Sequence, residues 1–260
     1  MKEILLLSFL LISLNLFAQQ KFQLAQPLVK YSSAFFSGST AFEALFNQPG
    51  AEIRYTLNGD EPTENDLLYK GPVSITKRSI VKLKSFSKDF LPSEPVIVEF
   101  IKNGKSIQQV DFSSPNETYD HAPKNILYDD IGGFTNFRGG TWLGYDKDSA
   151  VITISFAKKE KIKSVLVDML VDENSWIFLP DEILLFYLDS KSNSWLPVAK
   201  ASFQHDQPSP AKCVPYEIRP GKKVKADQLK LIFSVTKKIP DWHPGKGNHA
   251  WLFIDEIKVY

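Results

Sequence analysis

The sequence has little cysteine, little net charge and, beyond its first residues, no long hydrophobic run. Cys213 is the only cysteine among 260 residues, so no disulfide can form within the chain. A formal net charge of +1 gives no general attraction to nucleic acid or to an anionic membrane. No later stretch approaches the roughly 20 apolar residues of a transmembrane helix. We therefore expect hydrophobic cores to hold the fold, with no nucleic-acid partner and no membrane span.

Enzyme motifs are also missing. The chain contains no Gly-x-Ser-x-Gly elbow, no Walker loop, no His-Glu-x-x-His and no Cys-rich metal motif. Asp60 and Glu61 are adjacent, whereas a glycosidase needs two carboxyl groups that face each other about 5–10 Å apart. We therefore read this acidic pair as a solvated turn, and the sequence predicts a protein without a catalytic site.

The N-terminus has the pattern of a secretory signal. Lys2 precedes an apolar run from Ile4 to Phe17, and Ala18 follows as a small residue at the expected cleavage point. The run is too short for a comfortable membrane span of about 20 residues. We expect residues 1–18 to be a signal peptide and the chain to be exported, to the periplasm or the extracellular medium.

The rest of the chain is patterned as all-β. Short runs rich in β-branched and aromatic residues are separated by Gly, Pro, Asn and Asp, with no long run of helical period. The expected strands are 52–57, 73–75, 80–86, 96–101, 150–156, 162–170, 182–188, 229–235 and 250–259. Two lysine-rich patches, 158–161 and 222–225, are expected at solvated turns beside strands. The weakly patterned stretch between residues 100 and 125 divides the chain into two domains, 19–104 and 105–260.

The first domain carries a specific string, Tyr55-Thr56-Leu57-Asn58-Gly59-Asp60-Glu61-Pro62-Thr63. With the runs 68–73 and 80–86, it resembles the C-terminal module of chitobiases and β-hexosaminidases, also called the fibronectin type III associated domain. Asn58 stands where Asp is more usual, a change that keeps the turn chemistry. Over roughly residues 27–101 the resemblance implies a small fibronectin-III-like β-sandwich that acts as a spacer or packing partner.

The second domain carries four aromatic motifs: Trp142-Leu143-Gly144-Tyr145, Ser175-Trp176-Ile177-Phe178-Leu179-Pro180, Trp242-His243-Pro244-Gly245 and Trp251-Leu252-Phe253-Ile254-Asp255-Glu256-Ile257. Together they are similar to the discoidin, or coagulation factor 5/8 type C, family, which includes family 32 carbohydrate-binding modules. The version appended to family 20 β-N-acetylhexosaminidases of exported bacterial systems is more similar still. Over residues 106–260 this resemblance implies a discoidin-like jelly-roll β-sandwich, and it makes a separate glycoside hydrolase a candidate partner.

The same resemblance implies a structural calcium ion. It is held by a loop near the start of the domain and by a Glu near its C-terminus, positions matched here by Asp129 and Glu256. Calcium takes six to eight oxygen ligands, which two carboxylates and loop carbonyls could supply. Asp130 replaces the Gly usually found after the Asp. The alternative is that these acids satisfy backbone amides of the turn.

Carbohydrate recognition would use exposed aromatics, because a pyranose has an apolar C–H face that an indole can cover. The candidates are Trp142, Trp176 and Trp242, with His243 and Arg138 as polar partners. Trp242 lies in the most turn-rich loop. The alternative is that the indoles are core, as expected for Trp251 within an apolar strand. His243 and His249 make no recognisable zinc spacing, so hydrogen bonding is the favoured role.

The sequence thus favours an exported, non-catalytic carbohydrate-binding protein whose glycan ends in N-acetylglucosamine or galactose. One alternative is a structural or protein-interaction module of a glycan-degrading system, with its aromatics inside. A second is a hexosaminidase-like hydrolase, which needs two facing carboxylates in a cleft. Exposure of Trp242 and Trp142 favours binding, and burial of both favours the structural module.

Overall fold

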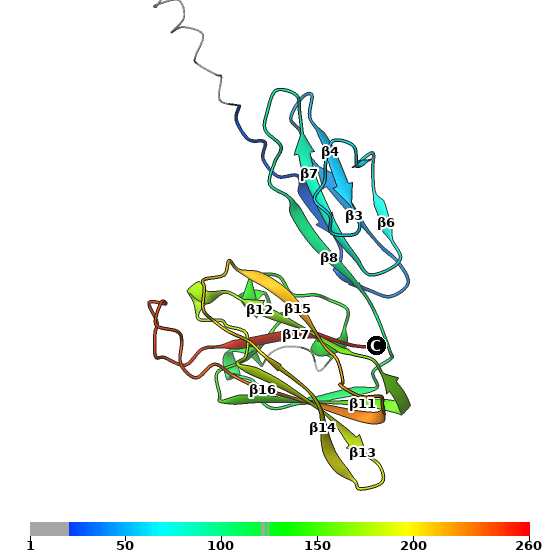
Figure 1. Ribbon diagram of the computed structural model, residues 1–260, viewed down its shortest axis with the longest axis vertical. Helices are drawn as coiled ribbons and strands as arrows, with labels where there is room; N and C mark the ends of the chain where they lie inside the picture. Colours follow the sequence, from blue (N-terminus) through cyan, green and yellow to red (C-terminus); the bar gives the residue numbers. More distant parts are fainter. Residues whose placement is uncertain (1–20, 121–122, 124) are drawn as a thin grey trace, which may run out of the picture. The chain divides into compact units, whose positions relative to one another are not determined.

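A computed structural model describes residues 21–120, 123 and 125–260, and the expected signal peptide (1–18) lies outside these residues. The chain forms two compact units (Figure 1). The second unit begins at Lys102, close to the expected boundary at 104/105, but it also includes the segment Ser33–Ser37. It is therefore discontinuous in sequence, which the strand pattern did not predict. No helix among the described residues is long and apolar enough to cross a membrane.

The first unit is a β-sandwich. Its three-stranded sheet has the order β1-β3-β6, and the other sheet has the order β2-β8-β7-β4-β5, of which β2 is grouped with the second unit. Phe42 on the first sheet is 1% exposed and packs against Tyr55 and Phe100 of the other sheet. The strands are β1 (Leu28–Tyr31), β2 (Phe35–Phe36), β3 (Thr40–Leu45), β4 (Glu52–Thr56), β5 (Leu67–Leu68), β6 (Val73–Ile75), β7 (Ser79–Phe86) and β8 (Val96–Lys102).

The turn predicted after β4 is present. Gly59 has φ +85°, and the amide of Asn58 donates to Asp60 Oδ2 at 2.6 Å. Glu61 is half exposed and pairs with Lys84 at 3.0 Å. The acidic pair is thus engaged with its own turn and with a neighbouring lysine, as expected for a solvated turn.

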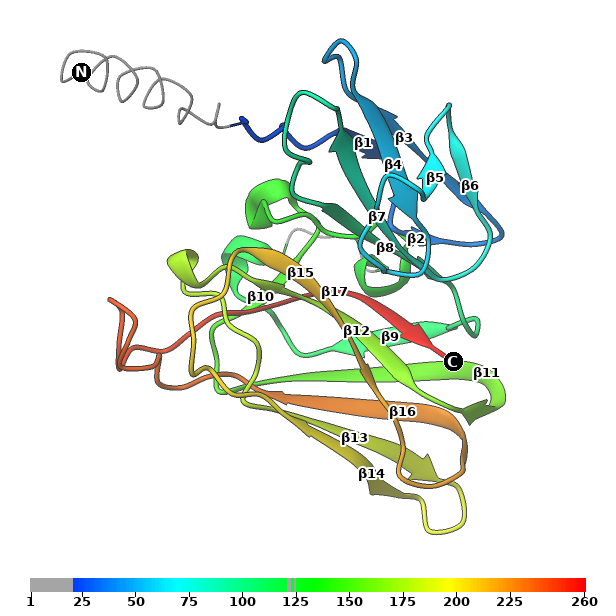
Figure 2. The same cartoon turned by 45° about the horizontal axis from the view of Figure 1, so that its top comes forward.

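The second unit is a larger sandwich of two sheets (Figure 2), with the orders β10-β17-β12-β15 and β14-β13-β16-β11-β9. Its strands are β9 (Gln109–Phe112), β10 (Leu143–Tyr145), β11 (Ser149–Ile162), β12 (Val165–Val171), β13 (Glu182–Asp189), β14 (Ser194–Ser202), β15 (Lys212–Ile218), β16 (Val224–Ser234) and β17 (Leu252–Val259). Four 3₁₀ segments complete it: η1 (Glu117–Tyr119), η2 (Ile126–Tyr128), η3 (Phe137–Gly139) and η4 (Glu173–Ser175).

The core of this unit follows from the strand sequences. Alternate residues of β11, such as Ile152 and Ile154, are fully buried, as expected for a strand with one face inward. The central neighbours β12 and β17 are buried at every position, and Leu170 and Phe253 of these strands pack against Trp142 and Ile177, which lie outside the strands. Their all-buried sequences include three acids, Asp168, Asp255 and Glu256.

One strand contradicts the expected turn at the lysine patch 158–161. β11 runs through the patch, and its pairing with β16 shifts register between Ser155 and Glu160. Lys105 pairs with Glu160 at 2.9 Å. The prediction was wrong because a β-bulge can absorb a polar stretch without ending the strand.

Gly133 marks the tightest approach of the backbone to a core aromatic. A Cβ atom there would lie 2.3 Å from two ring carbons of Trp142. Gly133→Ala is therefore expected to lower the free energy of unfolding by roughly 1–3 kcal/mol, measured by urea titration. Gly139→Ala is the matched control, since its Cβ would meet nothing within 4 Å. Equal stabilities of the two variants would contradict this packing.

Candidate functional site

Two loops at one end of the larger sandwich are tied together. Loop A spans residues 172–178 and follows β12, and loop B spans residues 236–251 and leads into β17; loop B is the orange-red excursion in Figure 2. The N–H of Trp251 donates to the carbonyl of Trp176 at 2.8 Å, and the N–H of Phe178 donates to the carbonyl of Trp251 at 3.0 Å. The loops therefore form one structural element.

The buried side chain of His243 connects the two loops. It is 6% exposed, its Nδ1 accepts the N–H of Gly245 at 2.9 Å, and its Nε2 lies 2.9 Å from the carbonyl of Glu173. These contacts assign a neutral ring whose proton is on Nε2 and donates to Glu173. His243 therefore positions both loops and has no ring nitrogen left for a ligand. His249 contacts Ala250 and Asp148 instead, so the two histidines do not share a site.

Trp176 is the most exposed of the predicted aromatic residues. Its φ is +64°, a left-handed conformation that bulky residues rarely adopt, and 39% of its surface is exposed. Its indole lies on Gly245, where a Cβ atom would approach ring atoms to 2.8 Å. The two loops thus hold an indole against the surface, with part of the ring open to solvent.

Trp242 is half-buried. Its Nε1 donates to the carbonyl of His205 at 2.6 Å, and its ring lies against those of Phe178 and His243. A buried indole usually finds such a partner for its N–H. The turn-rich sequence suggested exposure, but these contacts make Trp242 mainly a support for loop B.

Trp142 lies in the core. It is 1% exposed, its Nε1 donates to the carbonyl of Phe134 at 2.9 Å, and Leu170, Ile177 and Phe253 join it in one apolar cluster. It has no open face for a sugar. Burial of Trp142 with partial burial of Trp242 leaves Trp176 as the exposed member of the predicted set.

Arg138 is exposed on η3, with its guanidinium 5.0 Å from the Phe137 ring centroid. A chain of ring contacts extends from there, from Phe137 to Tyr119 at 6.2 Å and from Tyr119 to Trp251 at 5.5 Å. Phe137 and Tyr119 were not predicted as site residues, because both lie in stretches without strand periodicity. Arg138 is thus linked to the loop pair through partly buried rings.

The residues predicted to bind calcium form a hydrogen-bonded network. Glu256 is fully buried, its Oε1 accepts the N–H of Asp130 at 2.6 Å, and its Oε2 lies 2.5 Å from Lys258 Nζ. Asp129 Oδ1 accepts the N–H of Ile131 at 2.9 Å. Asp130 has φ +68°, so it keeps the left-handed conformation that favours Gly at this position.

This arrangement does not fit a calcium ion. The ammonium of Lys258 lies against the carboxylate that calcium would need, and like charges repel. Asp129 and Glu256 instead satisfy backbone amides of the loop. Among the described residues, no group of three or more His, Cys, Asp or Glu side chains is placed to hold a metal ion.

Burial dominates the electrostatics of β17. It raises the pKa of Glu256 to about 7, an effect that Lys258 opposes and Asp129 reinforces. Burial, with the charges of Glu256 and Asp168, raises the pKa of Asp255 to about 10. Burial also raises the pKa of the Cys213 thiol to about 12, which favours the protonated thiol.

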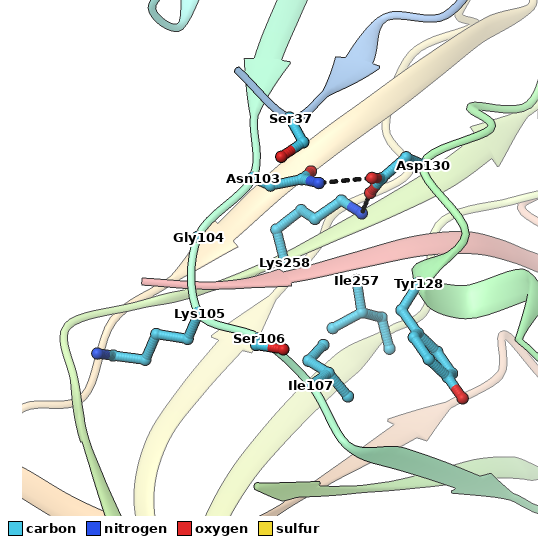
Figure 3. A pocket seen from close by; sticks show the side chains of 10 residues that line it. All are labelled: Ser37, Asn103, Gly104, Lys105, Ser106, Ile107, Tyr128, Asp130, Ile257 and Lys258. Carbon is cyan, nitrogen blue, oxygen red and sulfur yellow. Dashed lines mark hydrogen bonds and ion pairs between the residues drawn. The ribbon is translucent and has the colours of Figure 1, made fainter. Parts of the chain in front are cut away.

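The hydrolase alternative finds no support in the described pockets. A pocket of about 270 Å³ (Figure 3) has Asp130 as its only acidic residue. A second pocket, of about 510 Å³, has Glu160 as its only acidic residue. Asp168 and Asp255 are 2% and 0% exposed, so they do not face a cleft. Neither pocket offers the two facing carboxylates that glycoside hydrolysis uses.

Residues 32–97 match the family described as chitobiase/β-hexosaminidase C-terminal domain. This confirms the resemblance predicted for the first unit. The match covers part of that unit and none of the loop pair. A search of curated proteins found no match.

Solved structures similar to this chain include carbohydrate-binding and chitobiase domains. The GH29 fucosidase of Ruminococcus gnavus in complex with fucose is 15% identical (TM-score 0.36), covering 58% of this chain and 24% of the fucosidase. The module CpGH89CBM32-6 of Clostridium perfringens is 13% identical (TM-score 0.35), and the match covers 59% of this chain and 94% of that module. The C-terminal domain of a chitobiase from Bacteroides fragilis is 15% identical (TM-score 0.33), and the match covers 60% of this chain and 91% of that domain. The chain spans about a quarter of the fucosidase's length.

Proposed function

We propose that the second unit is a non-catalytic carbohydrate-binding module whose ligand stacks on Trp176. The observation that carries this proposal is the exposed indole on a strained backbone, with φ +64° and 39% of its surface exposed. Left-handed conformations of bulky residues cost of order 1–3 kcal/mol and cluster at ligand sites.

The surroundings of Trp176 suit a sugar. Gly245 lies under the ring, and buried His243 fixes both loops, so little ordering would be needed on binding. Asn174 and Lys246 are exposed on the same two loops and offer an amide and an ammonium for hydroxyl groups. One stacked ring with a few polar partners supports weak binding to the end of a glycan.

The family match supports a carbohydrate ligand of a particular kind. Residues 32–97 match a domain named after chitobiases and β-hexosaminidases. Glycans ending in N-acetylglucosamine or galactose are therefore the first to test. We further propose that the protein is exported and acts beside a separate glycoside hydrolase.

The direct test is isothermal titration of the protein, without residues 1–18, with oligosaccharides ending in N-acetylglucosamine or galactose. Trp176→Ala is expected to weaken binding at least tenfold, because the apolar face of the sugar loses the indole on which it stacks. Trp195→Ala is the control. Trp195 lies on β14, outside both loops and in the sheet that does not contain β12 and β17. We expect it to bind as the unchanged protein does.

Two outcomes would count against this function. Equal binding by the unchanged protein and Trp176→Ala would move the site elsewhere. A folded protein that binds none of the glycans would favour the structural module, which burial of Trp142 and packing of Trp242 already support.

A further inference from the structure

Lys258 is a buried cation near the C-terminal end of β17 in the larger sandwich. It is 4% exposed, and its ammonium lies 2.5 Å from Glu256 Oε2 and 2.6 Å from Asp130 Oδ1. Figure 3 shows the side chains of Lys258 and Asn103 converging on the carboxylate of Asp130. A lysine is almost never this buried unless it is paired.

Local geometry brings these groups together from distant parts of the chain. Glu256 and Lys258 are two residues apart on β17 and so share one side of the strand. Asp130 follows η2, and its left-handed conformation turns its N–H towards Glu256 while its carboxylate reaches Lys258. The amide of Asn103 donates to the second oxygen of Asp130 at 2.6 Å.

A single ammonium therefore connects the loop to the closing strand. A cation at this point neutralises the fully buried Glu256 and holds Asp130, 128 residues away in sequence, against β17. These are the tasks that a bound calcium ion would perform for two carboxylates on a loop and a strand. The ring of Phe35, whose centroid is 5.4 Å from Nζ, shields the ammonium further.

We propose that Lys258 is a built-in cation that replaces calcium in this jelly roll, so that the second unit folds and stays stable without metal. The inference does not depend on whether the unit binds a sugar. It concerns how the loop that contains Asp129 and Asp130 is held, and it makes the stability of the unit independent of the calcium concentration.

The first measurement is the thermal unfolding midpoint of the full chain in EDTA and in millimolar calcium. Tryptophan fluorescence reports on the second unit, because all five tryptophans lie there. The midpoint is expected to be the same in both solutions. A saturable rise of the midpoint with calcium would overturn the proposal, since it would show that a metal ion binds the folded state.

The second measurement tests the role of the lysine. Lys258→Met is expected to lower the midpoint by about 10 °C, because it leaves buried Glu256 without a counter-charge. Lys237→Met is the matched control, since Lys237 pairs with Asp148 at 2.6 Å with both side chains more than half exposed. A Lys258→Met midpoint equal to that of Lys237→Met would overturn the proposal.

A charge-matched double variant covers the case in which Lys258→Met does not fold. Lys258→Met with Glu256→Gln removes both buried charges, and it is expected to recover most of the lost midpoint. Failure of the double variant to improve on Lys258→Met would show that the lysine acts through packing and not as a cation.

Discussion

Replacing Trp142 with alanine is expected to lower the free energy of unfolding of the second unit by about 3–5 kcal/mol. The side chain is 1% exposed and fills the space between Leu170, Ile177 and Phe253. The substitution leaves a cavity and removes the hydrogen bond to the carbonyl of Phe134. Urea unfolding followed by the four remaining tryptophans measures the loss, since every tryptophan belongs to this unit.

Trp176→Ala provides the comparison for this experiment. Its indole is 39% exposed, so its removal is expected to change stability by less than about 1 kcal/mol while it weakens sugar binding. The two substitutions should therefore have different effects: Trp142→Ala lowers stability, and Trp176→Ala weakens sugar binding. A Trp142→Ala variant as stable as Trp176→Ala would contradict the buried position of Trp142.

Replacing Asp255 with asparagine is expected to stabilise the second unit at neutral and alkaline pH. Burial, with the charges of Glu256 and Asp168, raises the pKa of Asp255 to about 10 in the folded state, far above the ordinary value of 3.8. Between these two values the folded chain holds a proton that the unfolded chain releases, so stability falls as pH rises, by up to ~1.4 kcal/mol per pH unit. Asparagine has no proton to lose and is free of this penalty.

The measurement is the urea midpoint at pH 5, 7 and 9. The unchanged protein is expected to lose stability across this range, and Asp255→Asn is expected to lose much less. At pH 7 the variant is expected to be more stable than the unchanged protein by on the order of a few kcal/mol. Glu256, with its pKa of about 7, adds a slope of the same sign up to that pH in both proteins. Asp241→Asn, at an exposed position, is the control. Parallel pH profiles for the two variants would show that Asp255 is ionised when folded.

The fold was largely predictable, because alternation and turn residues are local signals. The Asn58-Gly59 turn and strands such as β7 and β13 are where the pattern predicts them. Several strands were missed, including β3 and β15. β15 contains Pro215, which lowers the strand signal but is tolerated because β15 is an edge strand of its sheet.

The candidate site was less predictable, because exposure depends on contacts between distant residues. Trp142 lies in a Gly-rich stretch that suggests a loop, yet Phe253, 111 positions later, helps to bury it. Similarly, nothing near Lys258 in the sequence indicates that it pairs with Asp130. The exposure of Trp176 was foreseen only as one of several alternatives. Side-chain types and spacing gave the list of residues, and the tertiary contacts decided their roles.

The discontinuous second unit has a consequence for how such modules are exchanged between proteins. Ser33 donates its hydroxyl to the carbonyl of Asp130 at 2.6 Å, and the ring of Phe35 lies beside Lys258. A gene fusion that begins at residue 102 would carry every strand from β9 onward but would leave behind the segment Ser33–Ser37, which belongs to the second unit. The two modules should therefore be inherited as a pair, and recombination at their apparent boundary should be selected against.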